Sequence, residues 1–243
     1  MFYESTRGGL KSISSAEAIK RGIAPDGGLF VPDEEIKMSL DEIGKLVNMN
    51  YQQRAAAILK YYLNDYSDQE IEECVNSAYT LEKFGCKEIA PINKLTDNIH
   101  VLELWHGPTC AFKDMALQIL PHLLVRAMKK TGETHELVIL VATSGDTGKA
   151  ALEGFRDVDG TRIIVFYPSH GVSEVQKMQM ITQEGKNVNS IGVLGNFDDA
   201  QNGVKAIFTN EKLIDTMVNS GYKFSSANSI NWGRLVPQVV YYF

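Results

Sequence analysis

Cysteine is scarce in this chain of 243 residues. Only three cysteines are present, at positions 74, 86 and 110, and both their odd number and their irregular spacing are unlike a disulfide framework. The five histidines are scattered and show no spacing typical of metal ligands. The sequence therefore predicts a protein of the reducing cytoplasm, without structural disulfides and without a metal site.

Excess positive charge and long apolar runs are also lacking. Lysine and arginine number 24 against 30 aspartates and glutamates, which gives a formal net charge of -6. A nucleic-acid surface needs a basic patch, and the balance of charge here argues against one. No apolar run approaches the length of a membrane span, and the N-terminus has no apolar core that could serve as a signal peptide. We expect neither nucleic acid nor a membrane as a partner, so any anion site must be local.

The first ninety-odd residues follow a helical pattern. In the stretch "SSAEAIKRG", Ser14 or Ser15 is placed to cap a helix and Gly22 to end it. The stretch "APDGGLFVP" at 24–32 has the composition of a turn, because proline fixes φ and two glycines allow positive φ. We expect residues 1–95 to form a helix-rich N-terminal region.

From Ile99 onward, short apolar runs alternate with helical runs. The predicted strands are 100–105, 136–143, 162–168 and 188–195, and the helices that follow them are 114–130, 147–157, 172–184 and 198–209. Near-continuous apolar strands are typical of a parallel sheet covered on both faces. Strands and helices in this alternation predict a three-layer α/β/α domain with right-handed crossovers over residues 96–243.

The end of the chain is apolar and abrupt. Its large side chains recur at helical spacing and are followed by no cap and no polar tail; they are Leu235, Val236, Val239, Val240 and Phe243. Such a face needs a partner surface. We therefore expect the C-terminal part of the α/β domain to be absent from these residues, as in the front part of a longer protein.

The loop 142–151, "ATSGDTGKAA", is the most informative candidate for binding a ligand. Ligands of α/β sheets bind beyond the carboxyl ends of the strands, and here an apolar strand ends in a glycine turn that opens a helix. Helix N-termini expose N–H groups with partial positive charge, and Gly145 and Gly148 let an anion approach closely. The added hydroxyl donors are Thr143, Ser144 and Thr147. The loop predicts a cradle for a carboxylate or phosphate, and the alternative is a plain turn capped by Asp146 or Thr147. It matches neither a Walker loop nor a dinucleotide fingerprint.

Two other loops contain residues that could take part in chemistry. In "HGPTCAFKD" at 106–114, Lys113 lies where a predicted strand passes into a predicted helix. A buried ammonium is costly, so this lysine is either a snorkelling stem or a reactive group, and taken alone the stem is favoured. His106 is kept only as a substrate contact. The stretch 195–197 is similar to a glycine-rich phosphate loop, but Asp198 and Asp199 follow it and would repel a phosphate, so they predict helix capping instead.

Four motifs together resemble the threonine synthase family, whose members are fold-type II enzymes that use pyridoxal 5'-phosphate (PLP). They are "APDGGLFVP", "ELWHGPTCAFKD", "TSGDTG" and "SANSINWGRLVPQ", in order along the whole chain. The resemblance implies a tryptophan-synthase-β-like fold and a Schiff base between Lys113 and the cofactor aldehyde. A lysine in a partly desolvated pocket loses its charge more readily, and the neutral amine attacks carbonyls. Phe112 is expected near the cofactor ring and Asp146 near its hydroxyl, whereas Asp114 is expected to point away and cap the next helix.

The resemblance also implies a reaction, the conversion of O-phosphohomoserine and water to threonine and phosphate in threonine biosynthesis. The cofactor is the electron sink and Lys113 moves the protons. The residues expected around the substrate are Thr143, Ser144, Gly145, Thr147, Gly148, Asn228, Ser229 and Asn231. Lys149 is expected to face solvent.

Part of the family's cofactor site is expected to lie outside this sequence. The family's Gly-Asn-Phe-Gly phosphate loop is expected beyond residue 243, so these residues alone should bind the cofactor poorly. Two alternatives stay open. One is a threonine-synthase-like phospho-lyase, and the other is a truncated, non-catalytic fragment.

Overall fold

A four-stranded parallel sheet forms the centre of the α/β part of the computed structural model, which describes all 243 residues. The strand order is β7-β6-β5-β8, with β5 at Glu136–Ala142, β6 at Thr161–Pro168, β7 at Val188–Val193 and β8 at Tyr222–Ser226. All three neighbouring pairs are parallel. The connecting helices are α8 (Asp146–Phe155), α9 (Glu174–Ile181), α10 (Phe197–Thr209) and α11 (Glu211–Asn219).

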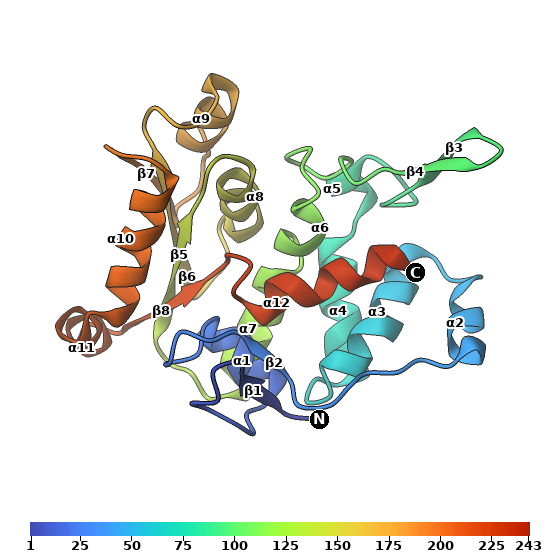
Figure 1. Cartoon of the computed structure of the whole chain (residues 1–243), viewed down its shortest axis with the longest axis horizontal. Coiled ribbons are helices and arrows are strands. Elements are labelled where there is room, and N and C mark those ends of the chain that lie inside the picture. Colours follow the sequence, from blue (N-terminus) through green and yellow to red (C-terminus); the bar gives the residue numbers. More distant parts are fainter.

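Both faces of this sheet are covered. Along β5, Leu137 and Val141 belong to the main apolar core, together with residues of α8 such as Phe155. Val138, which points to the opposite face, packs in a second core with Val204 of α10. Figure 1 shows α8 and α10 on opposite sides of the strands. The predicted three-layer α/β/α arrangement is confirmed, and burial of both faces explains the continuous apolar runs.

The predicted strand at 100–105 is not part of the sheet. β4 (Ile99–Leu102) instead pairs antiparallel with β3 (Ile92–Thr96) in a hairpin that projects from the molecule (Figure 1). The fourth strand of the sheet is β8, which the sequence analysis missed. A short apolar run fits a hairpin strand as well as a buried one, so periodicity alone could not separate the two.

The N-terminal region contains five helices and a short antiparallel ladder. The helices are α1 (Ser15–Arg21), α2 (Leu40–Leu46), α3 (Tyr51–Tyr62), α4 (Asp68–Ala78) and α5 (Leu81–Phe84), and the ladder pairs β1 (Tyr3–Ser5) with β2 (Phe30–Pro32). The helix α1 is capped as predicted: Ser14 accepts a hydrogen bond from the backbone N–H of Glu17, and Gly22 ends the helix at φ 74°. α1 packs on α7 (Leu120–Lys130), and the main core continues from these helices to the sheet. The division of the chain near residue 95 stays a prediction.

The apolar C-terminal stretch finds its partner within the chain. It forms α12 (Trp232–Leu235) and a 3-10 helix, η1 (Val236–Tyr242), which packs against α3. Val236 and Val240 are buried in the main core, and Arg54 Nη1 donates a hydrogen bond to the carbonyl oxygen of Phe243 at 2.9 Å. The partner surface that this apolar face was expected to need is therefore supplied in part by α3 of the same chain. Periodicity does not show which surface covers an apolar face. Among its residues Tyr242 and Phe243 stay exposed.

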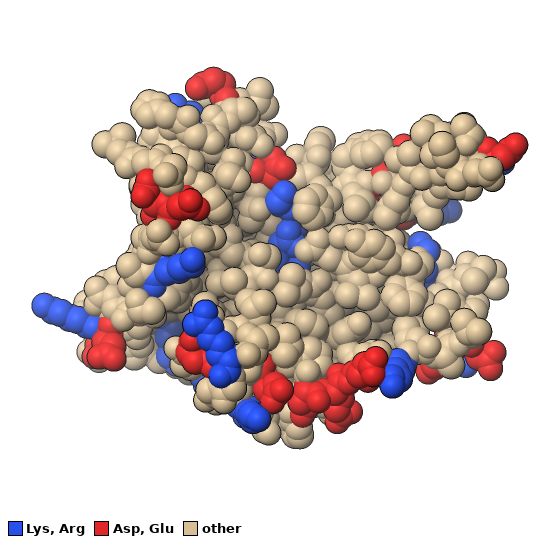
Figure 2. Space-filling model, viewed as in Figure 1, with Lys and Arg blue, Asp and Glu red and all other residues tan.

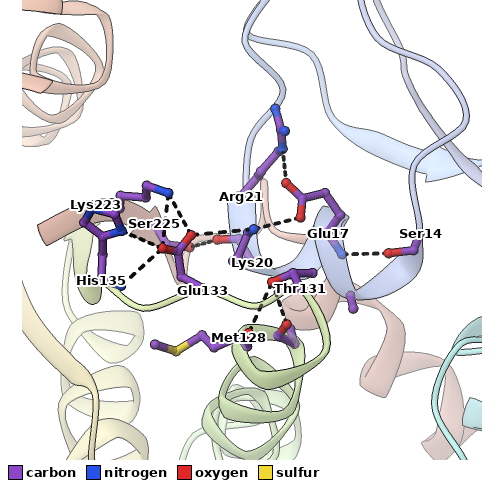
Figure 3. Close-up of polar contacts among 12 residues, drawn as sticks. Ser14, Glu17, Lys20, Arg21, Met128, Thr131, Glu133, His135, Lys223 and Ser225 are labelled. Atoms are coloured by element: carbon purple, nitrogen blue, oxygen red, sulfur yellow. Dashed lines mark hydrogen bonds and ion pairs between the residues drawn. The ribbon is translucent and has the colours of Figure 1, made fainter. Parts of the chain in front are cut away.

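A buried carboxylate joins three distant elements (Figure 3). Glu133, in the turn between α7 and β5, accepts hydrogen bonds from Lys223 Nζ of β8 at 2.9 and 3.1 Å and lies 2.7 Å from His135 Nδ1. Its carboxylate is also 3.6 Å from Lys20 Nζ of α1. Burial alone would raise the pKa of Glu133, but the bonds from Lys223 and His135 outweigh it and lower the pKa to about 2. This cluster fixes β8 and α1 to the start of β5.

The surface is mixed in charge. On the face shown in Figure 2, lysine and arginine side chains are dispersed among acidic ones. None of the helices combines the length and the apolar character that crossing a membrane requires.

Candidate functional site

The first turns of α6 (Asp114–Leu117) and α8 lie close together and bring two of the predicted residues into contact. Lys113 directly precedes α6, and Asp146 is the first residue of α8. The Lys113 Nζ lies 3.4 Å from Asp146 Oδ2, although the two residues are 33 positions apart. Figure 1 shows α6 and α8 side by side. In the same view, Figure 2 shows a hollow between the part of the molecule with the parallel sheet and the part with the N-terminal helices. An amine thus lies beside a glycine turn at a helix N-terminus.

The amine of Lys113 is only loosely held. Its 3.4 Å distance to Asp146 exceeds the roughly 2.7–2.9 Å of a charge-assisted hydrogen bond. The Nζ lies 4.3 Å from the ring centroid of Phe112, and the lysine side chain is 20% exposed. Its polar contact is Asp146 and its aromatic contact is Phe112, and no short ion pair occupies the amine.

The neighbouring carboxylate, Asp114, is turned away from this amine. It is fully buried and accepts hydrogen bonds from the backbone N–H and the hydroxyl of Thr109, both at 2.8 Å. Burial raises the pKa of Asp114, against the lowering effect of these two bonds. The predicted orientation agrees with the structure, but the predicted capping of the next helix is wrong. The carboxylate instead fixes the loop that leads into Lys113, and a side chain at Gly107 would collide with it.

The turn 143–148 is shaped from within by Thr143. This side chain is buried, and its Oγ1 accepts hydrogen bonds from the backbone N–H of Gly145 at 3.0 Å and of Gly148 at 2.9 Å. Gly145 has φ 151°, which residues with a side chain rarely adopt. The hydroxyl of Thr143 is therefore used inside the turn and is not free for a ligand. Of the predicted hydroxyl donors, Ser144 is exposed and Thr147 is half-buried.

The three residues predicted from "SANSIN" lie in different surroundings. Asn228 is hydrogen bonded to the backbone of Ala142, directly before the glycine turn, and Ser229 is exposed. Asn231 is fully buried, and its amide donates to the carbonyls of Ile19 and Ser226 at 3.0 and 2.8 Å. The side chain of Asn231 thus connects the backbone of α1 to the backbone of β8. This structure gives no support to a substrate contact by Asn231.

Two contacts made by side chains of α8 were missed or misjudged from the sequence. Gln176 Nε2 donates a hydrogen bond to Asp146 Oδ1 at 2.6 Å, and its only sequence signal is the capping pattern that begins at Ser173. Lys149 does not face solvent as predicted, since its amine contacts Gln183 and lies 3.7 Å from Glu153. The position of Lys149 in the first turns of α8 could not show that α9 packs against the side of α8 that carries it.

The remaining loop candidates have local partners. Asn196 and Asp199 form a reciprocal capping box at the start of α10, with hydrogen bonds of 2.8 and 3.0 Å, so the predicted capping role of Asp199 is confirmed. His106 lies 2.7 Å from Glu103 and stacks on the ring of Trp105. A substrate contact by His106 stays a prediction.

Chemistry, and not size, distinguishes the candidate site. No three His, Cys, Asp or Glu side chains come together in a way that could hold a metal ion. A groove of about 1040 Å³ runs along α3 and α4 and is lined by residues such as Tyr51, Arg54 and Asp68. None of the predicted site residues lines that groove.

The donors at the starts of α6 and α8 fit part of a PLP site. The loosely held Lys113 amine suits the aldehyde of the cofactor, and the exposed turn with Ser144 suits a carboxylate at a helix N-terminus. The stretch 195–197 is no phosphate cradle here, because Asp199 occupies the N-terminus of α10. The described residues thus fit the reactive end of the cofactor and do not provide the phosphate loop.

Comparison with known proteins gives consistent matches. The family model described as "Threonine synthase N terminus" matches residues 2–79. Threonine synthase of Pseudomonas aeruginosa is 40% identical over 244 residues, and human threonine synthase-like 1 is 42% identical over 236 residues. The crystal structure of PLP-bound threonine synthase from Brucella melitensis superposes with a TM-score of 0.86 at 38% identity and covers 99% of the chain. The resemblance drawn from the four motifs is therefore confirmed.

The matched relatives are longer than this chain. The chain is covered completely by the Pseudomonas protein but spans 50% of that protein, and it spans 31% of the human one. It likewise covers 50% of the Brucella structure. The 243 residues thus span about half the length of the threonine synthases they match.

Proposed function

Because this chain resembles the N-terminal half of threonine synthases along its whole length, we propose that the full-length protein is a PLP-dependent threonine synthase. It converts O-phosphohomoserine and water to threonine and phosphate. The observation that carries the proposal is the amine of Lys113, loosely held 3.4 Å from Asp146 at the glycine turn of α8. We place the reaction in the cytoplasm, in keeping with three cysteines that are all free.

The residues of this chain have separate tasks in the proposed reaction. PLP, when bound, supplies the electron sink that allows a proton next to the amino group to be removed. Lys113 would hold the cofactor through its amine and, once released, would accept and return that proton. Phe112 would pack near the ring of the bound cofactor, and the carboxylate of Asp146 would lie near the ring hydroxyl. The backbone N–H groups of the turn that Thr143 leaves unbonded, together with Ser144 and Thr147, would bind the substrate carboxylate.

Other predicted residues support this site indirectly. Thr143 shapes the turn through its bonds to Gly145 and Gly148, and Asn228 holds the backbone just before it. Asp114 fixes the loop that carries Lys113. Ser229, which is exposed near the same turn, stays in the proposal as a substrate contact.

Product analysis tests the proposal. The full-length protein is given PLP and O-phosphohomoserine, and both phosphate and threonine are measured. We expect the two products in equal amounts, and we expect both to be lost in Lys113→Ala while the variant keeps its fold. Absence of both products from the wild-type protein would leave the non-catalytic alternative.

A second candidate is a phospho-lyase that releases phosphate without making threonine. The chain is 42% identical to human threonine synthase-like 1 and 40% identical to the bacterial threonine synthase, so similarity alone does not separate the two candidates. The lysine and the anion turn would serve either reaction equally. Phosphate release without threonine would establish this second candidate and overturn the first.

A further inference from the structure

Gln176 connects two helices at the point where the candidate site is assembled. It lies in the first turn of α9, and its Nε2 donates a hydrogen bond of 2.6 Å to Asp146 Oδ1. The other carboxylate oxygen, Oδ2, is the one that faces Lys113 at 3.4 Å. Asp146 thus has one oxygen bonded to the amide of Gln176 and the other directed to the amine.

The orientation of the Gln176 amide is fixed by the helix cap. Its Oε1 accepts hydrogen bonds from the hydroxyl of Ser173 at 3.1 Å and from the backbone N–H of Ser173 at 3.4 Å. The backbone N–H of Ser173 can only donate, so the oxygen of the amide faces Ser173. The nitrogen is then directed at Asp146 as a donor, which is the arrangement that a carboxylate needs.

The glycine turn leaves room for this amide. A Cβ atom added to Gly145 would lie 2.5 Å from the side-chain amide atoms of Gln176, which is closer than real contacts permit. The amide therefore lies against the Cα atom of Gly145, the residue directly before Asp146. Gln176 is held from two sides, by its own cap and by the turn.

The two contacts of Asp146 are unequal in length. The bond from Gln176 is short, whereas the contact to Lys113 is longer than a charge-assisted hydrogen bond of about 2.8 Å. No other carboxylate competes for the amine, because Asp114 is bonded to Thr109. The only neighbouring cation on α8, Lys149, is occupied by Glu153 and Gln183.

We infer that Gln176 is a positioning residue that holds Asp146 back from a tight ion pair with Lys113. A tight pair would keep the amine charged and occupied, whereas the observed arrangement leaves it available to a carbonyl group. The inference rests on the proposed function for the use that is made of the amine. The geometry of Gln176, Asp146 and Lys113 can be tested without that function.

The test measures the reactivity of Lys113 in the full-length protein without cofactor. The protein is treated with trace acetic anhydride over a range of pH, and acetylation of Lys113 is quantified by mass spectrometry against the exposed Lys11 as an internal reference. In Gln176→Ala, Asp146 is free to close on the amine, so we expect labelling about tenfold slower, with the pH profile moved up by about one unit. Gln176→Glu should act in the same direction. It also keeps the fold, because glutamate preserves the capping box with Ser173.

Two further variants separate positioning from a general effect on the helix. Gln179→Ala changes another glutamine of α9 and should label like the wild type. In Asp146→Asn, which lacks the carboxylate, adding Gln176→Ala should change nothing further. Wild-type or faster labelling of Lys113 in a folded Gln176→Ala protein would overturn the inference. Since the assay contains neither PLP nor substrate, its outcome is independent of whether threonine is formed.

Discussion

The side-chain amide of Asn228 forms two hydrogen bonds with the backbone of Ala142, a residue 86 positions earlier in the chain. Its Nδ2 donates to the carbonyl oxygen at 2.9 Å, and its Oδ1 accepts from the backbone N–H at 3.2 Å. Ala142 ends β5 and directly precedes the glycine turn. The segment after β8 therefore fixes the point from which that turn starts.

Asn228→Asp tests this connection with a change of one atom. The new carboxylate oxygen would face the carbonyl of Ala142, so one hydrogen bond becomes a repulsion. We expect a loss of about 1–3 kcal/mol in the free energy of unfolding. Thermal unfolding measures it, with Ser229→Ala as the control because Ser229 is exposed and adjacent. Equal melting temperatures for the two variants would contradict the account.

Gly145→Ala tests the need for glycine in the turn. The residue combines φ 151° with the close approach of Gln176, so a methyl group should strain the backbone and displace the amide. We expect a loss of about 1–3 kcal/mol in stability. Gly203→Ala is the matched control: Gly203 lies within α10 with nothing within 4 Å of an added Cβ, so this change should be neutral or stabilising. A Gly145→Ala protein as stable as the Gly203→Ala protein would show that the turn tolerates a side chain.

The lowered pKa of Glu133 predicts that the stability of the fold depends on pH. The pKa of Glu133 is lowered from 4.5 to about 2 in the folded protein, so its contribution is complete above about 4.5 and is lost as the pH falls towards about 2. Glu133→Gln removes the carboxylate shared by Lys20, Lys223 and His135. We expect this variant to unfold about 5 °C below the wild type near neutral pH. The difference should shrink as the pH falls through that range, as measured by thermal unfolding at a series of pH values. A difference that does not change with pH would show that Glu133 stabilises the fold by packing and not by charge.

The sequence predicted the sheet best where apolar runs were continuous. The strands expected at 136–143, 162–168 and 188–195 agree with β5, β6 and β7. β5 and β6 are largely buried, as their apolar runs require, whereas β7 lies at the edge of the sheet and contains no buried residue. β8 was missed because its sequence, "YKFSS", is short and partly polar. Lys223 within it is explained only by its distant partner, Glu133.

The chemical residues were easier to recognise than their surroundings. The contact between Lys113 and Asp146 joins the two motifs that the resemblance singled out, but the strand expected before Lys113 belongs to a hairpin outside the sheet. Asn231 has the same residue type as Asn228, yet it is buried against α1. Sequence spacing does not show which other element of the fold a side chain will contact. The contact of Gln176 with Asp146 depends on how α9 packs, so no local pattern could predict it.

The central claim is that the Lys113 amine is the group that attaches the cofactor. The most direct measurement is borohydride reduction of the full-length protein after incubation with PLP, followed by mass spectrometry of its peptides. For the wild-type protein, the account predicts one pyridoxyl group, attached to Lys113. For Lys113→Ala, it predicts no pyridoxyl group on the corresponding peptide and no formation of threonine. A pyridoxyl group fixed on another lysine, or full activity in Lys113→Ala, would contradict it.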